Sequence, residues 1–190
     1  TSVMFDGSVE DFEKNVELTA KAVEIANKFD IPTEAELGKV GGKEDDLDGG
    51  SGNGYTDPTD AVEFVKATGV SSLAVAIGTA HGVYVGTPVL DVARLAEIRK
   101  ALEAAGVSIP LVLHGASGLT DESVRECIAE GICKVNFATE LRQAYSAGVK
   151  EVLAKDPDVY DPKKYGKVAM AKVQALVEDR IKVCGANGKA

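Results

Sequence analysis

The stretch Ile109-Pro-Leu-Val-Leu-His-Gly-Ala-Ser-Gly118 changes character within a few residues. Its first half is a short apolar run bounded by proline and glycine, which is typical of a strand buried on both faces. The run ends in His114, glycines and a serine follow, and Thr120 with the acids after it predicts the start of a helix. A strand, a polar tip, a glycine loop and a helix form the layout that presents reactive side chains at the carboxyl end of a parallel strand.

A second copy of this layout lies upstream. The segment from Leu73 to Gly82 is again apolar and again ends in His-Gly, at His81. The chain contains two histidines, and each is predicted to end such a strand. Neighbouring parallel strands would bring both imidazoles to one rim, so the pattern favours metal ligation by His81 and His114 over two histidines that only pack.

The same alternation of strand and helix runs through the whole chain. It predicts five units, whose strands end in Asp6, Glu36, His81, His114 and Asn136. Strict alternation predicts a parallel sheet. Five units do not close an eight-stranded barrel, so two alternatives stay open: an open doubly wound sheet, or the last five units of an (β/α)8 barrel. In either case we expect one domain over residues 1–190.

Local patterns predict the details of several elements. Ser8 with Asp11 resembles a capping box, followed by an apolar helix face of Phe12, Val16, Ala20 and Val23. Residues 41–57 hold six glycines and a run of acids, which predicts an irregular, mobile loop that is either a lid or a solvated linker. Residues 133–139 are expected to form a strand.

Composition narrows the classes of function. The formal charge of −9 and a pI near 4.8 argue against nucleic acid as a partner. No apolar run is long enough to span a membrane.

The three cysteines lack metal-site spacing, and an odd number without a secretory leader favours a reducing cytoplasm. Cys127 and Cys133 lie in apolar patterns and are expected to be buried.

Six ordered blocks resemble the class II, metal-dependent ketose-bisphosphate aldolases, over nearly the whole chain. They are Val-Met-Phe-Asp-Gly-Ser at 3–8, Glu-Ala-Glu-Leu-Gly at 34–38, Gly-Gly-Lys-Glu-Asp-Asp at 41–46, Ala-Ile-Gly-Thr-Ala-His-Gly at 76–82, Leu-Val-Leu-His-Gly-Ala-Ser-Gly at 111–118 and Lys-Val-Asn-Phe-Ala-Thr-Glu-Leu at 134–141. Within the family the chain is most similar to tagatose-1,6-bisphosphate aldolases. Val85 stands where many fructose-1,6-bisphosphate aldolases have a lysine.

The resemblance implies a TIM barrel of which strands four to eight are present and the first three units are missing. It also implies that a third zinc ligand, a histidine preceded by the catalytic aspartate, belongs to the missing part, since the chain has no Asp-His pair. Alone, the chain is therefore expected to be a poor enzyme. Expected partners are the missing N-terminal segment and further copies in a dimer or tetramer, because an open barrel exposes strand edges.

The activity that the resemblance implies is reversible cleavage of tagatose or fructose 1,6-bisphosphate to dihydroxyacetone phosphate and glyceraldehyde 3-phosphate. Zn²⁺ on His81 and His114 would stabilise the enediolate as a Lewis acid. Asp6 and Glu36 are assigned either to a secondary metal position or to hydrogen bonds with the histidines. Glu44 is assigned to the shuttling of the substrate proton.

Phosphate recognition is assigned by the same resemblance to backbone amides and small side chains of Gly82, Gly115, Ala116, Ser117, Asn136, Phe137, Ala138 and Thr139. A monovalent cation, Na⁺ or K⁺, near the phosphate is a further implication. The alternative to an aldolase is a non-catalytic module that binds a phosphosugar or assists assembly and lacks the Asp-His strand.

Overall fold

The computed structural model describes residues 1–44, 47–48, 54–86 and 88–189, without the side chains of residues 43, 44, 47 and 48. The strands are β1 (Val3–Phe5), β2 (Thr33–Leu37), β3 (Gly41–Glu44), β4 (Leu47–Asp48), β5 (Ser72–Val75), β6 (Ala80–His81), β7 (Leu111–Leu113) and β8 (Ile132–Val135). The helices are α1 (Phe12–Asn27), α2 (Pro58–Thr68), α3 (Val92–Ala104), α4 (Asp121–Ala129), α5 (Thr139–Lys155) and α6 (Pro162–Val183).

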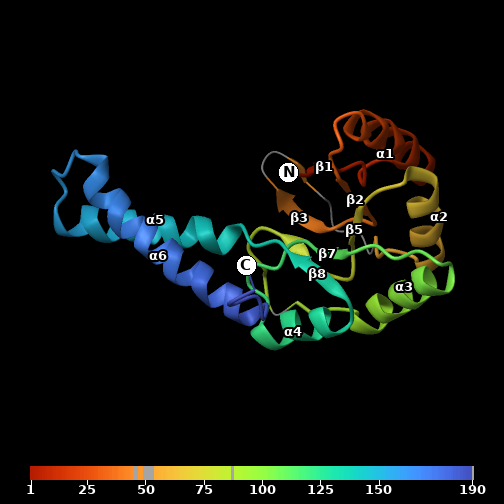
Figure 1. The fold of residues 1–190 in the computed structure, drawn as a ribbon. Coiled ribbons are helices and arrows are strands. Elements are labelled where there is room, and N and C mark those ends of the chain that lie inside the picture. The colour runs from red at the N-terminus through yellow and green to blue at the C-terminus, as the bar shows by residue number, and fades with distance from the viewer. Residues whose placement is uncertain (45–46, 49–53, 87, 190) are drawn as a thin grey trace. The chain divides into compact units, whose positions relative to one another are not determined.

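A parallel sheet forms the centre of the N-terminal part of the chain. Its five strands lie in the order β1-β2-β5-β7-β8, and every neighbouring pair is parallel. The strand order follows the chain, so right-handed connections place the helices on one face. There α1 packs on α2, α2 on α3 and α3 on α4 (Figure 1). The predicted parallel α/β architecture is confirmed.

Apolar side chains from the strands and helices fill the space between the two layers. Leu73, Val112 and Leu113 of the sheet are wholly buried, as are Phe64 and Ile98 of the helices. β2 departs from this pattern, because all five of its residues are buried although two are glutamates. A buried carboxylate must be paired, so β2 indicates where the polar chemistry of the sheet lies.

The start of α1 differs from the prediction. Asp11, not Ser8, is the N-cap, and its side chain accepts a hydrogen bond from Lys14 N at 2.8 Å. The buried face is also displaced from the apolar one, since it contains Asn15 and Thr19 together with Val23 and Ala26. Asn15 Nδ2 donates to the Glu36 backbone carbonyl at 3.0 Å, and Thr19 donates to Asn15. These hydrogen bonds allow polar groups to be buried.

The prediction that His81 ends a strand of the main sheet is wrong. β5 stops at Val75, and His81 lies in β6, a two-residue strand of a separate sheet ordered β4-β3-β6. Strands β3 and β4 fall within residues 41–57, so the prediction of an irregular segment is wrong there, whereas residues 54–57 form no helix or strand. Residues 45–46 and 49–53 of the expected lid lie outside the described residues.

Two predictions about the end of the sheet are wrong. β8 ends at Val135, and Thr139 is already the first residue of α5, so residues 133–139 are not one strand. Cys133 is exposed rather than buried, because β8 is an edge strand, whereas Cys127 on α4 is wholly buried as predicted.

The chain divides into two compact units, residues 1–136 and residues 137–190. The second unit is the antiparallel pair of α5 and α6, in which Gly148 lies directly against the Ala169 backbone. A single barrel domain over residues 1–190 stays a prediction. Within the described residues, no helix combines the length and apolar character needed to cross a bilayer.

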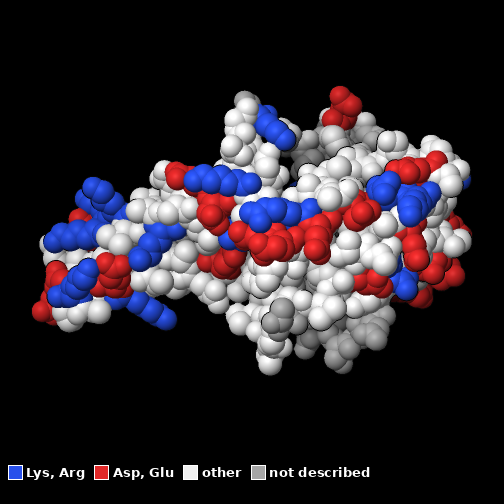
Figure 2. Space-filling model, turned by 90° about the horizontal axis from the view of Figure 1, so that it is seen from below, with Lys and Arg blue, Asp and Glu red and all other residues white. Residues whose placement is uncertain are grey.

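Charged side chains of both signs lie on the surface. On the face drawn in Figure 2, acidic and basic residues of the described chain are interspersed. Many belong to ion pairs along a helix, such as Arg99 with Glu103 at 2.9 Å and Lys155 with Glu151 at 2.8 Å. The absence of a nucleic-acid partner stays a prediction from composition.

Candidate active site

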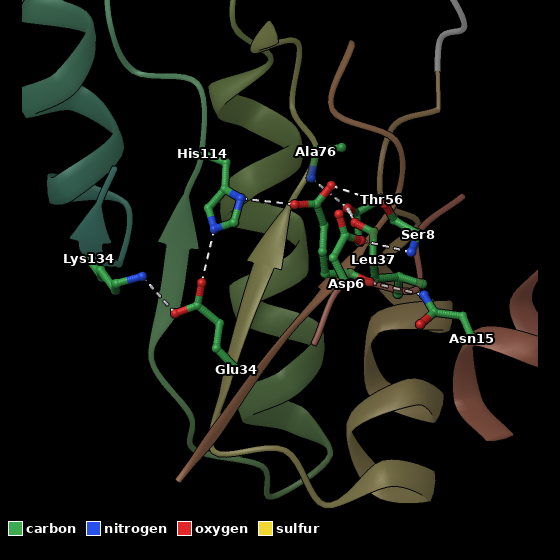
Figure 3. A network of polar contacts seen from close by, with 10 residues as sticks. Asp6, Ser8, Asn15, Glu34, Leu37, Thr56, Ala76, His114 and Lys134 are labelled. Atoms are coloured by element: carbon green, nitrogen blue, oxygen red, sulfur yellow. Dashed lines mark hydrogen bonds and ion pairs between the residues drawn. The ribbon is translucent and has the colours of Figure 1, made fainter. Parts of the chain in front are cut away.

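His114 lies just beyond β7 and is held between two buried carboxylates. Its Nε2 is 2.9 Å from Glu34 Oε1, and its Nδ1 is 2.9 Å from Glu36 Oε2 (Figure 3). Burial alone would lower the pKa of His114, but the two carboxylates outweigh it and raise the pKa to about 9. Both ring nitrogens then carry protons, and each faces one carboxylate.

Glu34 connects His114 to β8, an edge strand of the sheet. Its second oxygen accepts a hydrogen bond from Lys134 Nζ of β8 at 2.9 Å. β5 and β7 lie between β2 and β8 in the sheet, so this contact reaches across two intervening strands. Burial would raise the pKa of Glu34, but the hydrogen bonds from His114 and Lys134 hold it below its usual value. Glu34 is thus an anion fixed by two cations.

Glu36 is held more loosely at its carboxyl group. Ser8 Oγ donates to Glu36 Oε1 at 3.2 Å. Glu36 Oε2 is close to His114 Nδ1, yet no directed hydrogen bond reaches this wholly buried oxygen within the described residues. The Nε2 side of His114 is therefore fixed by a well-formed hydrogen bond, whereas on the Nδ1 side the contact is an ion pair by distance only.

His81 approaches His114 from the small sheet. The two ring centroids are 6.0 Å apart, with the ring planes inclined at 42°. The His81 backbone is placed by pairing with Gly42 of β3. Gly42 has a φ of +85°, and a Cβ there would lie 2.1 Å from the His81 carbonyl oxygen. Only glycine admits so close an approach. The structure therefore brings together the two histidines that the sequence paired.

A zinc ion fits these residues as an incomplete set of ligands. Imidazole nitrogen and carboxylate oxygen are both zinc donors, and Glu36 Oε2 is a buried oxygen without a directed partner next to His114 Nδ1. Within the described residues, however, no group of three His, Cys, Asp or Glu side chains is arranged to hold a metal ion. Two histidines are present, and a further ligand is needed.

The other two predicted acids occupy different positions. Asp6 follows β1 and accepts a hydrogen bond from the backbone of Ser8 at 2.9 Å, so it caps a turn next to Glu36 rather than contacting either histidine (Figure 3). Asp6 is exposed. Glu44 is the last residue of β3, and its side chain lies outside the described part of the chain.

The predicted phosphate-binding residues of the first unit lie in the turns after β6, β7 and β8. Gly115, Ala116 and Ser117 follow His114, and Gly82 follows His81. The Ala116 N–H donates to the Asn136 carbonyl at 3.2 Å, and the Asn136 N–H donates to Leu113 at 2.9 Å. These bonds fix the turn and the end of β8, but they also occupy the Ala116 amide.

Residues 137–139 belong to the second unit. Ala138 is the N-cap of α5, and its methyl side chain cannot accept a hydrogen bond from the first amides of this helix. Such amides favour anions, which is in accord with the predicted role of Phe137, Ala138 and Thr139.

Sequence analysis missed Glu34 and Lys134. Glu34 and Glu36 are two residues apart in a strand, so both point to the same face, and two glutamates in a buried strand were a signal that could have been used. Lys134 gave no such signal, because only the curvature of the sheet brings β8 within reach of β2.

The ion pairs of His114 predict how the stability of the metal-free chain depends on pH. The imidazole loses its proton near pH 6.5 in the unfolded chain and near pH 9 in the folded one. The stabilisation should therefore be complete below pH 6.5 and disappear as the pH rises through 9. Urea unfolding at pH 6, 7.5 and 9.5 measures this, and His114→Gln is the control whose profile should lack the decline. A wild-type curve parallel to that of the control would contradict the assignment.

A sheet ordered along the chain, helices on one face and polar side chains grouped at the carboxyl ends of strands define a segment of a parallel α/β barrel enzyme. The sequence matches the family described as fructose-bisphosphate aldolase class-II over residues 1–189. The chain belongs to this family.

Solved structures show the same relationship. The YdjI aldolase from Escherichia coli K12 is 39% identical, with a TM-score of 0.78, and the match covers 100% of this chain and 61% of that one. A protein of Coccidioides immitis assigned as a fructose-1,6-biphosphate aldolase is 34% identical, with a TM-score of 0.85. The match covers 99% of this chain and 64% of that one. The fructose-bisphosphate aldolase of Campylobacter jejuni shares the fold. It is 22% identical, with a TM-score of 0.77, and the match covers 96% of this chain and 60% of that one. The chain thus spans less than two thirds of these proteins.

Proposed function

We propose that this chain forms part of a metal-dependent aldolase that reversibly cleaves a ketose 1,6-bisphosphate to dihydroxyacetone phosphate and glyceraldehyde 3-phosphate. The observation that carries the proposal is the pair of imidazoles, 6.0 Å apart, beside the buried carboxylates at the carboxyl end of the sheet. Membership of the class-II family supports it.

His81 and His114 are proposed as two zinc ligands. For His114 the ligating atom is Nδ1, because Nε2 is already held by Glu34 and Nδ1 faces the oxygen of Glu36 that lacks a directed partner. Zinc bound there would act as a Lewis acid on the substrate carbonyl. Glu34, tied to Lys134, fixes the orientation of the His114 ring, as carboxylates beside metal-bound histidines commonly do.

The chain's own residues would bind and orient the substrate. Gly82, Ser117 and Asn136 are proposed to bind phosphate. The same role is proposed from the resemblance for Phe137, Ala138 and Thr139, through amides at the start of α5. In the turn after β7, Gly115 and Ala116 hold the backbone in place, since the Ala116 amide is already bonded. Glu44 is proposed to move the substrate proton. Asp6 and Glu36 are proposed to form a secondary metal position.

Finer assignments rest on sequence motifs. The preference for tagatose 1,6-bisphosphate is proposed from the His-Gly-Ala-Ser-Gly and Asn-Phe-Ala-Thr-Glu-Leu blocks. A Na⁺ or K⁺ ion near the phosphate and a dimer or tetramer are proposed from the family resemblance alone. A reducing, cytoplasmic location is proposed from the cysteines, and Cys127, Cys133 and Cys184 are all free.

The test is a cleavage assay with the zinc-loaded full-length protein on tagatose and fructose 1,6-bisphosphates. Dihydroxyacetone phosphate is followed by its reduction with a coupled dehydrogenase. We expect cleavage that is abolished by a chelator and restored by Zn²⁺, with at most weak activity from residues 1–190 alone. Saturable binding of the bisphosphate without cleavage by the full-length protein would overturn the proposal and favour a phosphosugar-binding module.

A further inference from the structure

The loops that carry the two histidines are joined by one side chain. The Tyr84 hydroxyl accepts a hydrogen bond from the Ala80 N–H at 2.8 Å and donates one to the Gly115 carbonyl at 2.7 Å. Ala80 directly precedes His81, and Gly115 directly follows His114. A single oxygen atom therefore connects the backbones next to both imidazoles.

The loop after β7 is shaped to receive this contact. Gly115 has a φ of +67°, and a Cβ there would lie 2.6 Å from the Ala80 carbonyl oxygen. Gly118 has a φ of +92°, and a Cβ there would lie 3.2 Å from Cδ2 of the Tyr84 ring. Glycine at both positions lets the two loops and the tyrosine ring meet closely.

The neighbours of Tyr84 do not anchor its segment. Val83 is 72% exposed, and Val85 is fully exposed. Tyr84 is partly buried between them, and this burial raises the pKa of its hydroxyl, so the group stays protonated and able to donate. The tyrosine is thus the inward-facing side chain of an otherwise exposed stretch.

We propose that Tyr84 is a positioning residue whose hydroxyl fixes the His81 loop against the His114 loop and so sets the separation of the two imidazoles. The consequence for metal binding rests on the proposed function, whereas the positioning itself does not. Tyr84 acts in this role through the backbone groups of Ala80 and Gly115, which neighbour the two histidines.

The test compares Tyr84→Phe, which removes only the hydroxyl, with Tyr160→Phe, whose ring is 92% exposed. In the metal-free chain we expect amide hydrogen exchange at Ala80 to quicken at least about tenfold in Tyr84→Phe. Amides of β2, β5 and β7 should keep their rates. The nuclear Overhauser effect between the two histidine rings should weaken. Both rings can be assigned, because the chain has only two histidines.

Metal affinity gives the functional readout. By competition with a chelator, Zn²⁺ affinity should fall about tenfold or more in Tyr84→Phe, as for other partners that orient ligands, and stay within twofold in Tyr160→Phe. Unchanged exchange at Ala80 and unchanged ring contacts would overturn the positioning role. Fast exchange at Ala80 in the unmodified chain would also overturn it, even if the variant failed to fold. A full-length wild-type protein that keeps the ring contacts but binds no zinc would overturn the proposed function alone.

Discussion

Replacing His114 with alanine should lower the free energy of unfolding by about 3 to 5 kcal/mol at pH 7, because the change leaves the buried carboxylate of Glu36 without its cationic partner. The side chains of Glu34 and Glu36 are only 7% and 2% exposed. Glu34 retains Lys134, so Glu36 accounts for most of the loss. Urea denaturation at pH 7 gives the value.

The matched control is the other histidine. His81 is only half-buried, so His81→Ala should change the free energy of unfolding much less than His114→Ala. A second control, Glu36→Gln in the His114→Ala background, should recover part of the loss, since it removes the unpaired charge. A loss below about 1 kcal/mol in His114→Ala, the range of an exposed ion pair, would show that these pairs do not form in solution.

Replacing His81 with alanine should instead abolish tight zinc binding by the full-length protein, in which the further ligand is expected. Loss of a ligand is more severe than loss of a residue that only orients one, so the affinity should fall by about 100-fold or more. Competition with a chromogenic chelator measures the change, and the unfolding midpoint of the metal-free variant shows that it still folds. Lys134→Met is the graded control, because it removes a group that acts on His114 only through Glu34, and its loss should be smaller. Equal affinity in His81→Ala and the wild type would exclude His81 as a ligand.

The parallel sheet could be predicted because its signals are local. Apolar runs such as Leu111–Leu113 end in polar residues, and helix starts such as Asp91 and Thr120 carry their caps in the sequence. The sequence also paired His81 with His114, although its premise, that both histidines end strands of the main sheet, is wrong for His81. These signals require no knowledge of how distant segments fold together.

Other features of the site depend on contacts that sequence spacing does not encode. His81 reaches His114 from a separate small sheet, through the pairing of β6 with β3, and not from the end of β5. Asn15 faces inward on α1 because a backbone carbonyl of β2 lies opposite. Lys134 meets Glu34 because the sheet curves. In each case a hydrogen bond formed by tertiary packing overrides the local pattern of apolar residues.

The most direct test of the account is a zinc titration of the metal-free chain, followed by the ring ¹H and ¹³C signals of its two histidines. We expect both rings to shift together and reach a plateau at one zinc ion per chain, because both are proposed to bind the same ion. Zinc that leaves either ring unmoved at that stoichiometry would contradict the shared site and, with it, the proposed chemistry of this chain.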